Sequence, residues 1–399
     1  MGNPAPIWYN FIRLLLFVRF LSGNGKMSGK TNLKTSVLVA ALSLAIVSTA
    51  FAGRVIYVDA DAPGSNDGTS WADAYNFLQD ALTDANSAFK PVEIRVAQGI
   101  YKPDQGAGVT PGDREAAFQL KNGVTLKGGY AGFGEPDPNA RDVELYETIL
   151  SGDLDGNDVE PNDPYDLLIE PSRGENSYHV VSAITAETTA MLSGFTITGG
   201  NANHYPNISG GGMYNYSGNP MLVNCTFSEN SGMMGGGMEN YSYSNPTLIN
   251  CSFNGNLAAN RGGAMCNSDS NPTLTNCTFS GNLAHRYGGA IGNKHSSPTL
   301  INCTISHNSA KDYGGGISNK YTNCSPALAN CILWGNSDRG GMNKSAQIHG
   351  GIPVISYSCI QGWTGSLGGG SNIGDDPLFV DADGADNVIG TRDYNLRLL

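Results

Sequence analysis

The most regular feature of this chain is a hydrophobic pattern that recurs every 26 residues in its central part. The recurring cysteines are Cys225, Cys251, Cys277, Cys303 and, after a two-residue insertion, Cys331. In each copy an apolar residue follows two positions later, and side chains two apart share one face of a β-strand. Each unit therefore predicts two or three short strands separated by turns rich in Asn, Gly and Ser.

A repeat of this length decides between the architectures that repetitive sequences adopt. Helical solenoids need units of about 33–47 residues with a helical period, and propeller blades need about 40. A flat coil of three short strands and three turns fits the 26-residue unit. Successive coils would stack as parallel strands about 4.8 Å apart. The sequence therefore predicts an all-β chain folded as a right-handed parallel β-helix.

Stacked coils turn the columns of the repeat into ladders in space. Three apolar columns, led by Leu222, Cys225 with Phe227, and Met213, are predicted to close a narrow core. Three Asn columns, led by Asn215, Asn224 and Asn230, are predicted to form ladders. Asn tolerates a left-handed backbone, and its amide can bond to identical side chains above and below.

The flanking segments depart from the repeat. We expect residues 53–190 to hold an N-terminal cap and the first coils, residues 191–374 the regular coils, and residues 375–399 a truncated C-terminal segment. Ser70 and Asp73 have the spacing of a capping box and predict a helix over residues 71–88. Its apolar face would cover the open edge of the first coil. Strands are predicted over residues 55–58, 92–101, 117–130 and 147–153.

The first 52 residues have the composition of a targeting region. Lys30 and Lys34 precede an apolar run over residues 36–47, and Ala50-Phe51-Ala52 offers a cleavage site. This pattern predicts a signal peptide that begins at Met27 and is cleaved after Ala52. The alternative is a membrane anchor, but each apolar run is shorter than the roughly 20 residues of a membrane span. We therefore expect a secreted or cell-surface protein, with outer-membrane association as one form of attachment and no transmembrane segment in the mature chain.

Charge narrows the choice of partners. Residues 53–399 contain 18 basic and 35 acidic residues, a net charge of −17. A nucleic-acid partner is excluded, because phosphate binding needs a basic face. We expect a monomer whose partner is a polysaccharide or another cell-surface molecule.

The cysteines allow two interpretations. Export would permit disulfides, and stacked Cα atoms lie within bridging distance. Parallel Cβ vectors fit a disulfide poorly, so we favour buried thiols that act as small hydrophobes. If a bridge forms, Cys324, Cys331 and Cys359 are the candidates.

The repeated elements CTFSGN and GGAI carry a family resemblance. They are similar to the repeats of chlamydial polymorphic outer membrane proteins. The segments IYVDADAPGSNDGTSWADAYNFLQDAL and DPLFVDADG resemble secreted right-handed β-helix proteins of planctomycete-like bacteria. The resemblance covers about residues 54–399 and implies the pectin-lyase-like fold. That fold hosts lyases, hydrolases and adhesins, so it implies no single function.

No catalytic constellation emerges from the repeat. Between residues 191 and 374 the acidic residues are Glu229, Glu239, Asp269, Asp312 and Asp338. They occupy different columns, so no carboxylate pair of the glycosidase type is evident. Arg286 is in register with Asp312, and this spacing predicts a surface ion pair in preference to a catalytic pair.

Two groups of residues are candidates for binding. Asp153, Asp155, Asn157 and Asp158 offer hard oxygen ligands suited to a structural Ca²⁺, although a solvated acidic turn is the simpler explanation of the same residues. No other cofactor is required.

The second candidate is an exposed stripe beside one Asn ladder, Tyr216, Tyr241, Lys294 and Lys320, in which aromatic rings could stack on sugars. An ordinary loop edge is the alternative explanation of this stripe.

For the whole protein we predict a non-catalytic β-helix protein for adhesion, envelope structure or glycan binding. The alternative function is that of a polysaccharide lyase or glycoside hydrolase.

Overall fold

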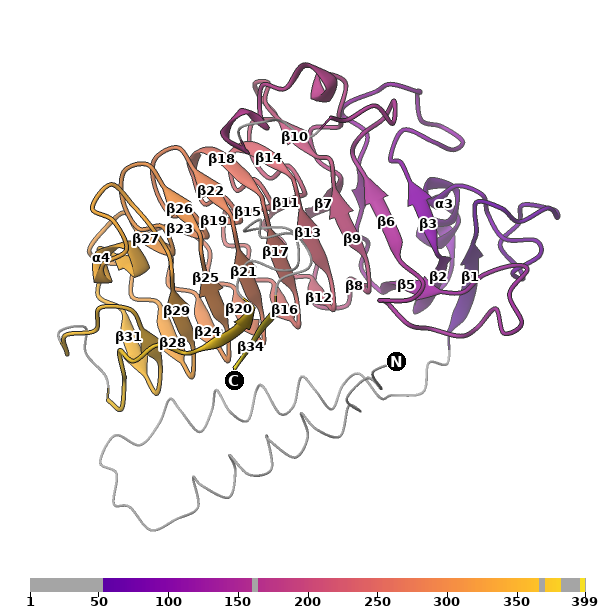
Figure 1. Cartoon of the computed structure of the whole chain (residues 1–399). Helices are drawn as coiled ribbons and strands as arrows, with labels where there is room; N and C mark the ends of the chain where they lie inside the picture. Colours follow the sequence, from indigo (N-terminus) through magenta and orange to yellow (C-terminus); the bar gives the residue numbers. More distant parts are fainter. Residues whose placement is uncertain (1–52, 160–163, 366–369, 382–394, 399) are drawn as a thin grey trace, which may run out of the picture. The chain divides into compact units, whose positions relative to one another are not determined.

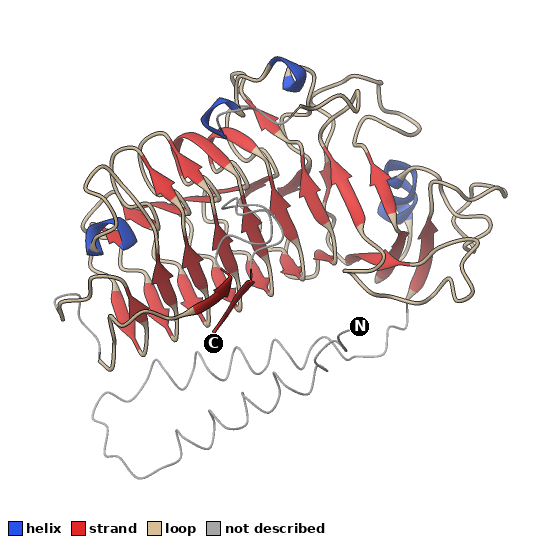
Figure 2. Cartoon of the chain, viewed as in Figure 1, coloured by secondary structure: helices blue, strands red, loops and turns tan. Residues whose placement is uncertain are grey.

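The computed structural model of the protein describes residues 53–159, 164–365, 370–381 and 395–398. Within this part, short strands from successive coils stack into long parallel ladders (Figures 1 and 2). The chain passes from sheet A to sheet B, crosses to sheet C, and returns to sheet A one coil further on. The predicted all-β parallel β-helix is therefore confirmed.

The strands of each sheet follow in spatial order. Sheet A contains β1 (Arg54–Val58), β2 (Val92–Ala97), β5 (Val124–Tyr130), β8 (Met191–Ser193), β12 (Met221–Val223), β16 (Thr247–Ile249), β20 (Thr273–Thr275), β24 (Thr299–Ile301), β28 (Ala327–Ala329) and β31 (Val354–Ser356). Sheet B contains β3 (Gly99–Tyr101), β6 (Thr148–Ser151), β9 (Thr196–Thr198), β13 (Thr226–Ser228), β17 (Ser252–Asn254), β21 (Thr278–Ser280), β25 (Thr304–Ser306), β29 (Ile332–Trp334) and β32 (Cys359–Ile360). Sheet C contains β4 (Phe118–Gln119), β7 (Val181–Ile184), β11 (Met213–Tyr216), β15 (Met238–Tyr241), β19 (Met265–Ser268), β23 (Ile291–Lys294), β27 (Ile317–Asn319) and β30 (Ile348–His349).

A fourth ladder, sheet D, differs from the three strands per coil that the repeat length predicts. Its strands are β10 (Asn201–Ala202), β14 (Ser231–Met234), β18 (Leu257–Arg261), β22 (Leu283–Ala284) and β26 (Ser309–Ala310). They lie between sheets B and C in chain order, and their extended backbone pairs with the next coil. This stretch lacks the strong apolar alternation by which strands are recognised in a sequence.

Outside the four ladders and the capping helix, the described residues form the antiparallel pair β33 (Phe379–Asp381) and β34 (Asn395–Leu398), the helix α4 (Lys344–Gln347), and the 3-10 turns η1 (Pro164–Asp166) and η2 (Pro171–Arg173).

The register of the ladders follows the repeat. Leu222 pairs with Leu248, and Phe227 pairs with Phe253. The rings of Phe227, Phe253 and Phe279 are stacked, with centroids 4.7 and 4.9 Å apart and nearly parallel planes, at angles of 4° and 3°. These side chains are fully buried, as are the Leu and Met columns. The three predicted apolar walls therefore form one continuous core.

The cysteines of the repeat lie in this core. All eight cysteines of the chain are free and buried. The thiol of Cys251 donates to the carbonyl oxygen of Leu222 in the preceding coil at 3.7 Å. Burial raises the pKa of the Cys277 thiol well above its ordinary value. These groups therefore behave as small apolar side chains with a weak donor.

The three Asn ladders occupy different environments. The ladders that contain Asn215 and Asn230 are buried, whereas most of the ladder from Asn224 to Asn330 is exposed. In that exposed ladder every Asn has a left-handed backbone, with φ between 51° and 56°. Adjacent amides bond to each other in all three ladders, as between Asn240 and Asn267 at 2.9 Å.

The capping helix is shorter than the sequence predicts. Helix α3 (Leu78–Ser87) begins after Phe77 and buries Leu78 and Leu82, as well as Ala81 and Ala85, against the first coil. The Ser70 hydroxyl does accept from the backbone N–H of Asp73 at 3.1 Å, but this bond closes a turn outside the helix. The chain between this turn and α3 cannot be helical, because the backbone of Tyr75 pairs with β1 at Val58. Trp71 instead packs against Tyr57 and Tyr130.

Two expectations concern export and the membrane. The predicted signal region, residues 1–52, lies outside the described residues and stays a prediction. Among the residues that are described, none of the helices combines the length and the apolar character that a membrane crossing requires.

Candidate functional site

The outer face of sheet C carries the side chains that alternate with its buried Met and Asn columns. Tyr216, Tyr241, Ser268 and Lys294 are register partners on four successive strands. The backbone N–H of Lys320 donates to the carbonyl oxygen of Asn293 at 2.9 Å, which places Lys320 one coil beyond Lys294. The structure thus brings the four residues of the predicted stripe onto one edge of sheet C.

The aromatic end of this stripe is accessible. Tyr216 and Tyr241 are 38% and 43% exposed, and their ring centroids are 5.8 Å apart. At the other end, Lys320 lies over the ring of Tyr321, which stacks on His295 with a centroid distance of 4.2 Å. Both ends of the stripe are therefore exposed, with aromatic rings at one end and a cation beside a ring pair at the other.

A groove that the sequence reasoning missed lies beside the stripe. It has a volume of about 430 Å³, and its walls include Arg261, Arg286, Tyr287, Tyr313, Lys320 and His349. Backbone β-bridges link Arg261 to Tyr287 and Tyr287 to Tyr313, so these residues occupy the same position in three successive coils. The ring of Tyr313 stacks on Tyr287 at 6.3 Å and on His349 at 4.6 Å. Lys320 is the one residue that the stripe and the groove share.

The sequence did contain a signal for this groove. Arg261, Tyr287 and Tyr313 each stand immediately before a glycine block, in RGGAM, YGGAI and YGGGI. These glycines are needed because a Cβ would come within 2.3 Å of backbone atoms of the neighbouring coil at Gly263, and within 2.4 Å at Gly289. The position before each block therefore projects a large side chain beside a closely packed backbone.

A buried polar cluster lies next to the groove on sheet C. The Ser268 hydroxyl donates to Glu239 at 3.2 Å, and Cys266 lies 3.9 Å from the same hydroxyl. Arg261 extends across Gly292, where a Cβ would come within 2.0 Å of its Cγ atom. Burial raises the pKa of Glu239 to about 7, although hydrogen bonds from Cys266 and Ser268 and the charge of Arg261 oppose the shift. Glu239 Oε2 and Arg261 Nε are buried and have no hydrogen-bond partner among the described residues.

The groove is basic in an acidic protein. Residues 191–374 contain seven Lys and Arg against five Asp and Glu, whereas residues 53–190 contain nine against 24. One of the acids near the groove, Asp312, forms the predicted surface ion pair with Arg286 at 3.4 Å. Arg261 and Lys320 form no ion pair within the described part of the chain. This face therefore attracts negatively charged groups.

The predicted cation ligands are only partly brought together. Asp153 and Asp158 lie in one cluster, and Glu175 joins them from a separate segment. Asp155 and Asn157 are exposed and lie outside that cluster. The backbone N–H of Asn157 donates to Asp153 Oδ1 at 3.1 Å, so this residue shapes the turn.

The comparisons with known proteins agree with this geometry. Residues 183–351 match the family described as right handed beta helix region. A search among curated proteins finds no significant relative. The handedness of the β-helix is therefore the predicted one.

The similar solved structures are distant in sequence. Pectate lyase Pel9A superimposes with a TM-score of 0.50 at 13% identity, over 88% of this chain and 91% of that one. Pectin methylesterase PemA from Erwinia chrysanthemi gives a TM-score of 0.41 at 10% identity, over 81% and 91% of the two chains. A rhamnogalacturonan lyase gives 0.36 at 10% identity, over 87% and 97%. At such identities the likeness to pectate lyase Pel9A shows the right-handed β-helix fold alone.

Proposed function

We propose that this right-handed β-helix protein is exported and binds acidic glycans, without cleaving them, along the outer face of sheet C. The observation that carries the proposal is the groove in which the rings of Tyr287, Tyr313 and His349 are stacked beside basic side chains. The proposal places the protein in the medium or on the cell surface, as a monomer in an adhesive or envelope role.

The chemistry of the groove suits a sugar that bears a carboxylate or sulfate. The Arg286 guanidinium is exposed, and a ligand oxyanion that takes the place of its long 3.4 Å contact with Asp312 can be held through two parallel hydrogen bonds, while Lys320 supplies a point charge. The faces of aromatic rings offer apolar contact to the C–H groups of a sugar ring. Because the protein as a whole is strongly acidic, nonspecific attraction of polyanions is weak, and binding would depend on this face.

The absence of cleavage is inferred from the placement of the acidic groups. The five acids of residues 191–374 occupy different columns of the repeat. Asp312 is committed to Arg286 at 3.4 Å. Glycoside hydrolysis usually needs two carboxyl groups that flank one bond.

The test is a glycan array that contains acidic and neutral polysaccharides. We expect binding to acidic glycans that is lost in an R286A/Y313A/K320A variant. The matched control is Arg339→Ala, which removes one exposed cation outside the groove. A second variant, Y216A/Y241A/K294A, tests the remainder of the stripe. Unchanged binding in the groove variant would refute the proposal.

One observation favours the alternative of a polysaccharide lyase or glycoside hydrolase. A carboxyl with a pKa of about 7, such as Glu239, can exchange a proton near neutral pH. Incubation with the same glycans would then release unsaturated products or new reducing ends. Turnover that Glu239→Gln abolishes would replace the binding proposal with this activity.

A further inference from the structure

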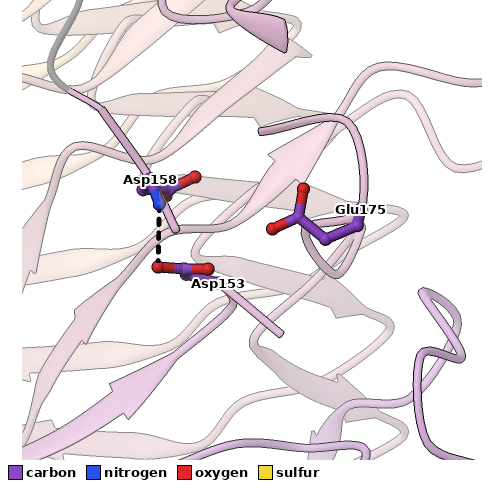
Figure 3. A group of neighbouring side chains, drawn as sticks. All are labelled: Asp153, Asp158 and Glu175. Atoms are coloured by element: carbon purple, nitrogen blue, oxygen red, sulfur yellow. Dashed lines mark hydrogen bonds between the residues drawn. The ribbon is translucent and has the colours of Figure 1, made fainter. Parts of the chain in front are cut away.

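Three carboxyl groups converge where the long segment between β6 and β7 leaves and rejoins the β-helix. Figure 3 shows Asp153, just after β6, with Asp158 and Glu175 facing the same space. One oxygen of each lies within 4.8 Å of the others. The base of the segment is closed by a hydrogen bond from the backbone N–H of Ser177 to the carbonyl oxygen of Gly152, at 2.8 Å. Glu175 is thereby held next to Asp153 although 22 positions separate them in the sequence.

Several oxygen atoms around this point are buried but have no hydrogen-bond partner. Among the described residues these are Asp158 Oδ1, Glu175 Oε1, Asn176 Oδ1 and Ser177 Oγ. Asn176 and Ser177 are both fully buried. The Asn176 amide lies against the cluster, because its Nδ2 donates to Asp158 Oδ2 at 2.9 Å. Arg173 Nε, a donor, is also buried without a partner, so the unpartnered atoms are mainly but not solely acceptors. Buried polar groups are normally satisfied, and this excess of acceptors indicates that a cation or water belongs among them.

The charges at this point favour a divalent cation over water. The only buried cation in contact with the cluster, among the described residues, is Arg173, whose Nη1 lies 2.9 Å from Asp158 Oδ2. Three carboxylates against one guanidinium leave two negative charges. A bound divalent ion would cancel this excess.

The number of oxygens at this point favours one divalent ion over the other. Ca²⁺ binds six to eight oxygens at about 2.3–2.6 Å, so its ligands lie up to about 5 Å apart across the ion. Mg²⁺ requires about 2.0–2.1 Å and nearly ideal octahedral geometry. The three carboxylate oxygens lie within 4.8 Å of one another, and with the unpartnered side-chain oxygens of Asn176 and Ser177 they offer five ligands, which suits the higher coordination number of Ca²⁺. Asp153 already accepts three backbone N–H groups, which fixes the orientation of its carboxylate.

We propose that Asp153, Asp158 and Glu175 bind one Ca²⁺, with the side-chain oxygens of Asn176 and Ser177 available as further ligands. The ion fastens the end of the segment to its beginning. This segment also reaches a later coil, where Lys311 lies 4.1 Å from the ring centroid of Tyr165. Calcium binding is therefore expected to order the connection between β6 and β7.

The experiment uses the whole mature chain, freed of metal with a chelator and titrated with CaCl₂ or MgCl₂ by calorimetry. We expect one Ca²⁺ per chain, weaker binding of Mg²⁺, and a thermal midpoint that rises with Ca²⁺ concentration. Glu175→Gln keeps the side-chain size and removes a repelled charge, so this variant should fold. It should lose about tenfold or more in Ca²⁺ affinity, because ligand charge sets the affinity of such sites. The matched control Asp155→Asn removes the same charge from an exposed position of the same turn and should keep its affinity.

A second measurement reports on the segment itself. Limited proteolysis between residues 154 and 175 should slow when Ca²⁺ is added to the wild type and to Asp155→Asn, but not to Glu175→Gln. Absence of Ca²⁺ binding in the wild type would show that water occupies the site and would overturn the proposal. Equal Ca²⁺ affinity in Glu175→Gln, or Mg²⁺ binding as tight as that of Ca²⁺, would overturn the ligand assignment. None of these results depends on whether the protein binds glycans.

Discussion

The buried Asn ladder gives the sharpest test of how these coils are held together. Asn256 Nδ2 donates to the carbonyl oxygens of Phe227 and Asn254 at 2.9 and 3.2 Å, and to Asn282 Oδ1 at 2.9 Å. Its Oδ1 accepts from the backbone N–H and from Nδ2 of Asn230, both at 3.1 Å. One fully buried side chain thus bonds to three successive coils.

Asn256→Ala would leave the backbone N–H of Asn230 without its acceptor, in a place that water does not reach. A buried unsatisfied donor costs about 1–3 kcal/mol, and the space left by the amide adds to this. We expect the free energy of unfolding to fall by about 3 kcal/mol. Asn276→Ala in the exposed ladder provides the contrast, because water can replace its bonds to Asn250 and Asn302.

At the exposed position, Asn276, the substitution by alanine has a cost in backbone conformation. Asn276 has φ of 54°, and alanine in this left-handed region costs about 1–2 kcal/mol. Asn276→Gly removes that cost and should be nearly neutral. The assay is urea unfolding followed by circular dichroism, with equal slopes for all variants. The reasoning fails if Asn256→Ala destabilises the protein by less than Asn276→Ala, or if Asn276→Gly is as costly as Asn276→Ala.

Three further outcomes follow from the core and the sheet C cluster. Phe253→Ala removes the middle ring of the stacked column and should cost about 4 kcal/mol in the same unfolding assay, whereas Phe253→Leu should cost clearly less. Because the pKa of Glu239 is about 7 in the folded protein and 4.5 when exposed, the folded state binds a proton more tightly. The free energy of unfolding should therefore be highest at low pH and should decline as the pH rises from 4.5 to about 7. Glu239→Gln should flatten the decline in unfolding midpoints measured from pH 4.5 to 8, and an unchanged profile would contradict the assignment. A thiol reagent should label all eight cysteines after unfolding without reductant but few in the native protein, and fewer labels after unfolding would reveal disulfides.

The sequence was sufficient for the parts of the fold that repeat. A column such as Phe227, Phe253 and Phe279 predicts its own contacts, because the only neighbours that matter are the same position in the next coil. The solenoid is therefore nearly one-dimensional, and the period determines both core and register. Lys294 and Lys320 were placed correctly relative to each other for this reason.

The parts that failed depend on contacts between unlike segments. Residues 71–77 have a helical pattern, but pairing of Tyr75 with β1 diverts them. Glu175 could not be linked to Asp153 from spacing, because a hydrogen bond from Ser177 to Gly152 brings the two ends together. No local pattern encodes such a closure. The sequence therefore predicted two carboxylates of the cluster, Asp153 and Asp158, but not Glu175. It also included Asp155 and Asn157, which lie in the same turn but outside the cluster.

The departures from the repeat on sheet C set one outward column apart from the regular columns of the core. The inward columns carry similar side chains in each coil, which stacking alone explains. The outward column Tyr214, Glu239, Cys266, Gly292 and Ser318 changes at every coil. A ladder gains nothing from placing a buried carboxyl at Glu239, because desolvation penalises its charge and, within the described residues, its Oε2 lacks a partner. Glycine at position 292 is equally specific, since any larger side chain would displace Arg261 from its place beside the groove. Both residues reduce the regularity of the scaffold on sheet C next to Arg261, which lines the groove that we propose as the glycan-binding site.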